Sequence, residues 1–314
     1  MMQHPSAPAT RLALAAALAV VVSAAGLAST DRAPVTEPPR VSELPFTFTT
    51  GQPIVPVSVN GGAAVPFVVD TGASIHLIDR PLADRATMAG GRTVPLTGGG
   101  QATVDTRFVD GVTLSAGGLR WASQRAALAP IGYPEHKHFA GLLGAPILMA
   151  YAAEFAFTTH VLRLHDPARY RIPTGAVRIP FELDEHLPII HVTIDAGSGP
   201  IDARLMVDTG AATAIDLNRP FVDAHRLVDA MPDAAAQDRP AALGGTAPFL
   251  YATGRRATVG GLRFDRPRLG LSRATTGSSS RRERDGIIGT DLLRGFDMTV
   301  DYRRRTLVLV RPGR

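Results

Sequence analysis

The sequence predicts an all-β protein whose two related lobes enclose a cleft. Three observations support this fold class: a repeat covers most of the chain, the repeats consist of alternating apolar stretches divided by glycine-rich turns, and helical segments are short. The repeat defines the domains, with an N-terminal lobe at residues 45–167, a linker at 168–179 and a C-terminal lobe at 180–312.

The repeat is visible as matched blocks whose offset grows slowly along the chain. The Pro-Phe pair at 45–46 matches 180–181 at an offset of 135, and the Gly-Leu-Leu-Gly stretch at 141–144 matches Gly-Ile-Ile-Gly at 286–289 at an offset of 145. Loops accept small length changes that cores do not. The two copies therefore represent one structural unit that occurs twice.

Within each copy the elements are predicted to be strands. Residues 54–59 alternate between apolar and polar positions, an Asn-Gly-Gly hairpin signal follows, and a second strand is expected at 65–69. Near the end of the chain, strands are expected at 298–302 and 306–310. The Pro-Leu-Ala-Asp, Pro-Phe-Val-Asp, Ala-Pro-Ile-Leu and Thr-Asp-Leu-Leu stretches are long enough only for short helices.

The tetrapeptide Asp-Thr-Gly-Ala occurs in both copies, at 70–73 and 208–211. Each copy follows a predicted strand, so each carboxylate should stand in a tight turn at the strand end. If the two turns face each other, Asp70 and Asp208 form a pair, and the two carboxyl groups cannot both be ionised at once. One acid beside one base is the arrangement that adds water to an amide, and these two residues are the predicted catalytic groups.

Composition excludes several other classes. The chain has 314 residues, is 45% hydrophobic and contains no cysteine, which rules out disulfides and thiol nucleophiles. Its net charge of +5 comes almost entirely from arginine, without a basic stretch interleaved with aromatics, so nucleic acid is not an expected partner. His136 and His138 lie beside Glu135 but lack further ligands at metal-site spacing. We expect no metal and no cofactor.

The N-terminus predicts export. Arg11 precedes an apolar, alanine-rich stretch at 12–28 that ends in small residues, as a cleaved signal peptide would. The alternative is an uncleaved N-terminal anchor in the inner membrane. Residues 1–28 are thus assigned to the signal, and 29–44 to a flexible tether. The expected location is periplasmic or secreted.

The repeated part of the chain resembles the aspartic proteases, specifically the retroviral-type (retropepsin-like) branch. The form it resembles is a bacterial exported one in which a single chain carries both copies in tandem. The resemblance rests on the two Asp-Thr-Gly-Ala loops and on the apolar-apolar-Gly elements that end at Gly144 and Gly289. It implies a two-lobed acid-protease fold in which each lobe is a retropepsin-like β-barrel, with a pseudo-twofold axis through the cleft. Because one chain supplies both halves, a monomer is expected.

The resemblance also assigns supporting roles. Thr71 and Thr209 would bond across to the opposite lobe beneath the two aspartates, and Gly72 and Gly210 would bring backbone N–H groups close to the carboxylates. Ala73 and Ala211 follow the glycines, where pepsin-like relatives have a hydroxyl that bonds the ionised carboxylate. Its loss should raise the pKa values of the pair, so we expect activity at mildly acidic pH.

Two further features leave alternatives open. Glycine-rich hairpin tips could be flaps that close over a peptide, or ordinary polar turns; the glycines in question are Gly98, Gly99, Gly100, Gly244 and Gly245. Basic segments at 135–138 and 281–284 suggest a preference for acidic substrates, with a solvated charged loop as the alternative.

The predicted function is that of an aspartic endopeptidase acting on peptide or protein substrates. A catalytically silent peptide-binding module of the cell envelope, using the same cleft, is the alternative. A third reading is a structural envelope protein in which the repeat is only architecture. Two adjacent carboxylates repel each other and have no use in a purely binding cleft, which favours the enzyme.

Overall fold

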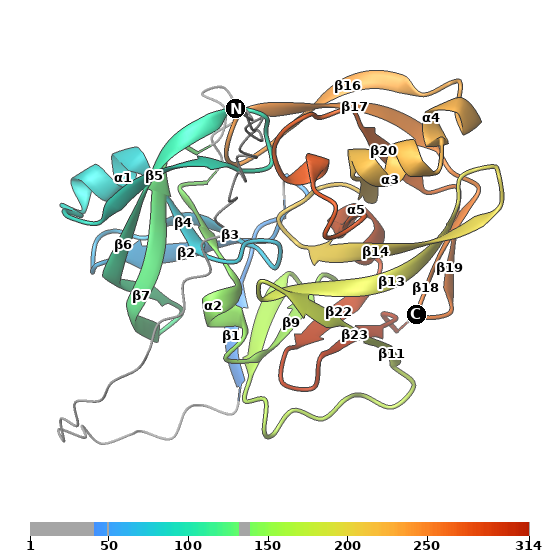
Figure 1. Cartoon of the computed structure of the whole chain (residues 1–314). Coiled ribbons are helices and arrows are strands. Elements are labelled where there is room, and N and C mark those ends of the chain that lie inside the picture. Colours follow the sequence, from blue (N-terminus) through green and yellow to red (C-terminus); the bar gives the residue numbers. More distant parts are fainter. Residues whose placement is uncertain (1–40, 49, 132–138, 314) are drawn as a thin grey trace, which may run out of the picture. The chain divides into compact units, whose positions relative to one another are not determined.

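The structure, a computed structural model, describes residues 41–48, 50–131 and 139–313. As predicted, it is all-β, and its strands form three sheets (Figure 1). This arrangement agrees with the two-lobed acid-protease fold that the resemblance implies. Among the helices in the described ranges, none has the length and apolar character needed to span a membrane.

The first sheet comes from the N-terminal half and has seven strands in the order β2-β3-β8-β4-β7-β6-β5. Its strands are β2 (Ile54–Val59), β3 (Val65–Val69), β4 (His76–Asp79), β5 (Arg92–Thr97), β6 (Thr103–Ala116), β7 (Leu119–Ala129) and β8 (Gly141–Leu143). The predicted strands at 54–59 and 65–69 are confirmed. Helices α1 (Arg80–Arg85) and α2 (Ala145–Leu148) each have a proline in the first turn, where its missing N–H is not needed.

The second sheet comes from the C-terminal half, in the order β16-β17-β20-β15-β21-β14-β13-β18-β19, with β12 paired to β13. Its strands are β12 (Glu182–Asp184), β13 (Leu187–Asp195), β14 (Pro200–Asp208), β15 (Ile215–Leu217), β16 (Ala235–Pro240), β17 (Thr246–Thr253), β18 (Arg256–Val259), β19 (Leu262–Asp265), β20 (Arg268–Ser272) and β21 (Gly286–Gly289). Its helices are α3 (Arg219–Ala224), α4 (Leu227–Ala230), the 3₁₀ turn η2 (Ser278–Ser280) and α5 (Thr290–Leu293).

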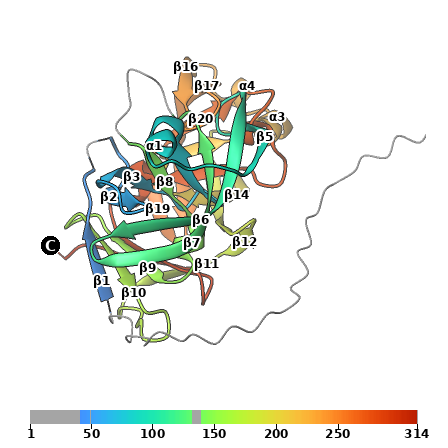
Figure 2. The ribbon, with the colours of Figure 1, turned by 90° about the vertical axis from the view of Figure 1, so that its left-hand side faces the viewer.

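The third sheet joins the two halves. Its order is β1-β10-β9-β22-β23-β11, so three strands come from each half, and β9 pairs antiparallel with β22 at the junction. Its strands are β1 (Val41–Pro45), β9 (Ala152–Ala156), β10 (Val161–His165), β11 (Val177–Pro180), β22 (Asp297–Asp301) and β23 (Thr306–Val310). Figures 1 and 2 both show these strands along the lower side of the protein.

This sheet corrects two predicted boundaries. The tether predicted at 29–44 is wrong for residues 41–44, which lie in β1 and pair with β10. The linker predicted at 168–179 is likewise too long, since β11 begins at residue 177. Both errors have one cause: these edge strands pair with segments far away in the sequence, and their own composition is that of a loop. The signal assigned to 1–28 lies outside the described residues.

The two halves repeat one pattern of strand pairing. In the N-terminal half, β3 pairs parallel with β8, and β4 pairs antiparallel with β8 and parallel with β7. In the C-terminal half, β14 pairs parallel with β21, and β15 pairs antiparallel with β21 and parallel with β20. Corresponding strands therefore end in corresponding places, and this sets the two aspartate loops.

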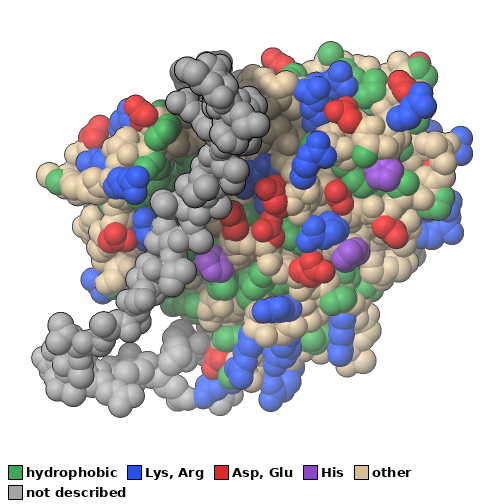
Figure 3. Space-filling view, viewed as in Figure 1, with side chains coloured by type: hydrophobic (Ala, Val, Ile, Leu, Met, Phe, Trp, Pro, Cys, Tyr) green, Lys and Arg blue, Asp and Glu red, His purple; other side chains and the backbone are tan. Residues whose placement is uncertain are grey.

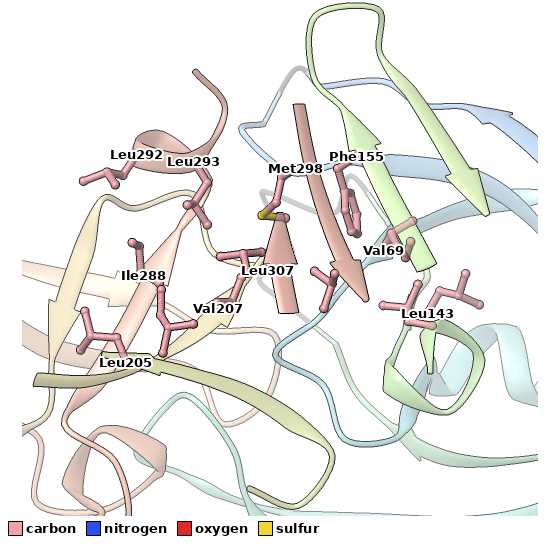
Figure 4. Close-up of a cluster of buried hydrophobic side chains, with 14 of the residues drawn as sticks. Val69, Leu143, Phe155, Leu205, Val207, Ile288, Leu292, Leu293, Met298 and Leu307 are labelled. Atoms are coloured by element: carbon pink, nitrogen blue, oxygen red, sulfur yellow. The ribbon is translucent and has the colours of Figure 1, made fainter. Parts of the chain in front are cut away.

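A continuous apolar core connects both halves to the third sheet (Figure 4). Val69 and Val207, the residues immediately before the two aspartates, are completely buried in it. Phe155 and Met298 belong to this core from β9 and β22, directly opposite each other. The loops that follow β3 and β14 thus start from rigid, close-packed positions.

Candidate active site

Each predicted catalytic aspartate ends a buried strand. Asp70 follows β3, and its N–H donates to the carbonyl of Leu143 in β8 at 3.0 Å. Asp208 is the last residue of β14, opposite Gly289 of β21. In each loop the alanine three residues after the aspartate, Ala73 or Ala211, donates its backbone N–H to the carbonyl of that aspartate at 3.4 Å. Parallel pairing to a neighbouring strand therefore fixes where each carboxylate points.

The two loops are tied together by their threonines. The Thr71 hydroxyl donates to the Val207 carbonyl at 2.7 Å and accepts the Thr209 N–H at 3.0 Å. The Thr209 hydroxyl makes the same two bonds, to the Val69 carbonyl at 2.7 Å and from the Thr71 N–H at 3.0 Å. Both side chains are completely buried. The structure thus has the cross-bonding that the resemblance implied for these residues.

Removing one of these hydroxyls should destabilise the fold strongly. Thr71→Ala leaves the Val207 carbonyl and the Thr209 N–H buried without a partner, so we expect the free energy of unfolding to fall by about 2–4 kcal/mol. Thr71→Ser keeps the hydroxyl and should recover most of that loss. Urea denaturation measures both, with Thr193→Ala, at an exposed hydroxyl bonded to Asp202, as a control. A Thr71→Ala variant no less stable than this control would contradict the role given to the cross-bonds.

The two carboxyl groups meet. The N–H of Gly72 donates to Asp70 Oδ1 at 2.8 Å, and the N–H of Gly210 donates to Asp208 Oδ1 at 2.9 Å. A methyl group placed on Gly72 would lie 2.5 Å from Asp208 Cγ, and one placed on Gly210 would lie 2.5 Å from Asp70 Cγ. Each carboxyl group thus sits against the opposite loop, where only glycine leaves room.

Their surroundings distinguish the two aspartates. Burial raises the pKa of Asp70 well above its ordinary value, and the charge of Asp208 raises it further. Burial also raises the pKa of Asp208, but Arg239 opposes this most strongly, followed by the hydrogen bond from Asp70. No arginine is among the main influences on Asp70. The arginine charges therefore favour the ionised form of Asp208, within a pair whose two protonation steps belong to both groups together.

The predicted hairpin tips meet each other. The tip between β5 and β6 lies against the tip between β16 and β17: Gly100 N–H donates to the Leu243 carbonyl at 2.9 Å, and Ala102 N–H donates to the Gly244 carbonyl at 2.9 Å. A segment ahead of β21 joins them, since Ser278 N–H donates to the Gly98 carbonyl at 2.9 Å. The hairpins are thus hydrogen-bonded to each other in this structure.

These tips border a cavity of 680 Å³ that contains both aspartates. Gly98 and Gly99 line it, whereas Gly100 and Gly244 make the contact between the tips. Gly245 has a positive φ of 78° and accepts the Ala241 N–H, so it closes its own turn. That the glycines contact substrate remains a prediction.

Three residues at this site were not found from the sequence. Gln52 crosses between the halves, its Nε2 donating to the Gly210 carbonyl at 2.6 Å. Arg239 and Asp216 line the cavity with their charged groups 3.4 Å apart. Nothing in the local sequence signals them, because their place depends on the strand register.

The two basic segments have different outcomes. Residues 135–138, with both histidines considered as metal ligands, lie outside the described residues. In the other segment, Arg281 and Arg284 line the cavity. Arg284 is almost completely buried and pairs with Asp184 at 3.2 Å, so this part is not simply a solvated loop.

When the chain is compared with known protein families, a match is found in the N-terminal half. Residues 55–147 match the family model for aspartyl protease. The match includes the first Asp-Thr-Gly loop and β8, just under a third of the chain. It supports a protease, and hence a hydrolase, at the level of the family. No curated protein matches the chain.

Proposed function

We propose that the chain is an aspartic endopeptidase that cleaves peptide or protein substrates with a water activated between Asp70 and Asp208. The observation that carries this proposal is the meeting of two buried carboxyl groups from corresponding loops, both with a raised pKa. A cavity of 680 Å³ is large enough for several side chains of an extended peptide.

In the proposed reaction, the Asp208 carboxylate takes a proton from the water while the water oxygen attacks the carbonyl carbon. Asp70 donates its proton to the carbonyl oxygen, which gives a tetrahedral diol. Asp208 then returns its proton to the amide nitrogen as the C–N bond breaks, and Asp70 regains a proton from a diol hydroxyl. The products are an acid and an amine, and the pair returns to its starting state.

The surrounding residues would hold this geometry. The threonine cross-bonds fix the two loops relative to each other, and the glycine N–H groups orient one oxygen of each carboxyl group. The hairpins must separate to admit a peptide and can then close over it, which would exclude bulk water during the reaction.

Two further parts of the proposal concern the whole protein. We propose that it acts as a monomer, because both aspartate loops come from one chain. We also propose that it is exported, either free or held by an N-terminal anchor; the sequence feature behind this lies in residues 1–28.

The function is tested by incubating the purified full chain with an unfolded protein in ¹⁸O-labelled water, from pH about 3 to 7, with and without a metal chelator. We expect new peptides, each with one ¹⁸O in its new C-terminal carboxyl group, and no effect of the chelator. Peptide binding without cleavage at any pH would instead support the silent binding module.

A further inference from the structure

Because the chain is a repeat, each half forms a side pocket of the cavity from corresponding strands. In the N-terminal half, Leu77 of β4 stands opposite Leu142 of β8. In the C-terminal half, Asp216 of β15 stands opposite Ile287 of β21 in the same kind of antiparallel pairing. All four residues line the cavity. Asp216 therefore occupies the position that Leu77 has in the other half.

The hairpins give a second corresponding pair. Leu96 pairs with Val104 in the first hairpin, one step before the pair that closes its tip. Arg239 pairs with Ala247 at the same step of the second hairpin. Both Leu96 and Arg239 line the cavity. Arginine thus stands where the other half has leucine.

A third pair comes from the segments ahead of β8 and β21. Phe139 lies two residues before Gly141, and Arg284 lies two residues before Gly286, at the start of the corresponding strand. Both side chains line the cavity. At three corresponding positions, an apolar residue in the N-terminal half is replaced by a charged one in the C-terminal half.

The N-terminal pocket is a continuous apolar surface. Leu77 and Leu142 belong to a buried apolar cluster, with Leu96 and Phe139 packed against it. Among the described residues of this half that line the cavity, Asp70 is the one charged group. An apolar side chain on this side of the cleft would be buried without loss of a polar contact.

The C-terminal pocket is rich in guanidinium groups. Those lining the cavity belong to Arg239, Arg268, Arg281 and Arg284. Outside the aspartate pair, the carboxylates in the same lining belong to Glu185 and Asp216. Arg268 bonds to Gln237 at 2.8 Å and lies over the Tyr251 ring. On the face that Figure 3 shows, side chains of both charges are interspersed over this half. Within the lining, Arg284 is paired with Asp184 and Arg281 with Glu185, so Arg239 and Arg268 are the guanidinium groups best placed for a ligand.

Arg239 has unused hydrogen-bonding capacity. Its Nη2 donates to Ser279 Oγ at 3.3 Å, and its Nε lies 3.4 Å from Asp216 Oδ2. That Nε and Asp216 Oδ2 are both buried and face each other without an aligned hydrogen bond, so the donors left for a ligand are those of the two terminal nitrogens. A guanidinium group has five N–H donors that match a carboxylate in a two-pronged geometry.

We infer that the two side pockets give the enzyme a one-sided specificity: the N-terminal pocket takes an apolar side chain, and the C-terminal pocket takes an acidic side chain, Asp or Glu, on the opposite side of the cut bond. This inference rests on the proposed function, because it assigns the substrate class of the same cleft. The acidic side chain would accept hydrogen bonds from Arg239 and be attracted by Arg268.

A basic side chain fits this pocket less well. Of the two carboxylates in this lining, Glu185 already faces Arg281 at 4.0 Å, and the side chain of Asp216 is only 2% exposed, against 18% for Arg239. Asp216 also accepts the Thr213 hydroxyl at 2.8 Å. A ligand in the cavity therefore meets the guanidinium group before the carboxylate.

The test uses the full chain and a peptide library varied at three positions on each side of the cut. For the wild type we expect kcat/KM about 10- to 100-fold higher for Glu than for Gln at one fixed position, with an apolar preference across the bond. In an Asp216→Leu/Arg239→Leu double variant, which copies the N-terminal pocket, the Glu-to-Gln ratio should fall to about one. Arg239→Gln, which keeps a polar side chain with N–H donors but removes the charge, is a second variant should the double one fail to fold. The control is Arg125→Leu, at an exposed residue outside the cavity lining, and it should keep the wild-type ratio.

A second readout separates this inference from the proposed function. Binding of labelled Glu and Gln peptides to the Asp70→Asn protein is measured by fluorescence anisotropy. Glu-selective binding without cleavage by the wild type would refute the endopeptidase and support the pocket. Cleavage without a Glu preference, or with a preference for Lys or Arg, would overturn the pocket and leave the endopeptidase standing.

Discussion

An Asp208→Asn variant is expected to lose about 10²- to 10⁴-fold or more of its peptidase activity while keeping its fold, because the amide cannot take a proton from water. Asp70→Asn should lose as much, since it removes the proton that the substrate oxygen receives. In each variant the amide has the shape of the original group and can still bond the remaining carboxylate. The two changes remove one catalytic unit, so the double variant should be little worse than either single one.

Asp110→Asn is the matched control. Its side chain is 81% exposed, it lies at a loose ion pair with Arg125 at 3.8 Å, and it is outside the cavity lining. This variant should keep wild-type kcat/KM. Urea denaturation and near-UV circular dichroism establish that the Asn variants are folded. If a folded Asp70→Asn or Asp208→Asn protein kept a tenth of the wild-type activity, the shared-water mechanism would be wrong.

The Asp70→Asn variant should also be more stable than the wild type near neutral pH, but not at acidic pH. Burial and the neighbouring Asp208 raise the pKa of Asp70 in the folded state, so the folded state binds protons more tightly than the unfolded one. The unfolding free energy must then fall as the pH rises from the unfolded pKa of Asp, about 3.9, through the folded pKa. Asparagine has no such proton to lose.

Thermal unfolding from pH about 3 to 8 measures this difference. Each kcal/mol that Asp70→Asn adds to the unfolding free energy should raise the melting temperature by about 2–4 °C in a protein of this size. Asp110→Asn again provides the control. A difference between Asp70→Asn and wild type that is the same at every pH would contradict the raised pKa, because it would reflect packing alone.

The same shifts set the pH range of hydrolysis. The pair is active while it holds one proton, so activity is lost on the acid side when the pair takes up a second proton and on the alkaline side when it loses its last one. Both pKa values are raised, and Ala73 and Ala211 offer no hydroxyl to the ionised group. The profile of kcat/KM against pH should therefore be bell-shaped with a mildly acidic optimum, and a strongly acidic optimum like that of pepsin would contradict it.

The sequence predicted the aspartate loops because the information in them is local. Asp-Thr-Gly after a strand needs only neighbouring residues to form its turn, and its duplication in the repeat showed that two such turns exist. The short helices and most strands followed for the same reason: their proline starts, glycine turns and alternation can be read within a few residues.

What could not be predicted depends on pairing between distant segments. β1 was taken for a tether because it is an edge strand whose partner lies about 120 residues away. The charged pocket was missed for a similar reason. The offsets between the copies relate Asp216 to Leu77 and Arg239 to Leu96, but that all four side chains line one cavity follows only from the strand pairing.

The most direct test of the shared-proton account is a ¹³C NMR titration of the full chain labelled at its aspartate carboxyl groups. Two signals should be assigned to Asp70 and Asp208 by their loss in the Asn variants, with Asp216→Asn identifying the third buried carboxyl group. We expect the Asp70 signal to titrate at a higher pH than any exposed aspartate, and the Asp208 signal to shift again at that same pH. Two independent titrations close to the ordinary aspartate pKa would contradict it.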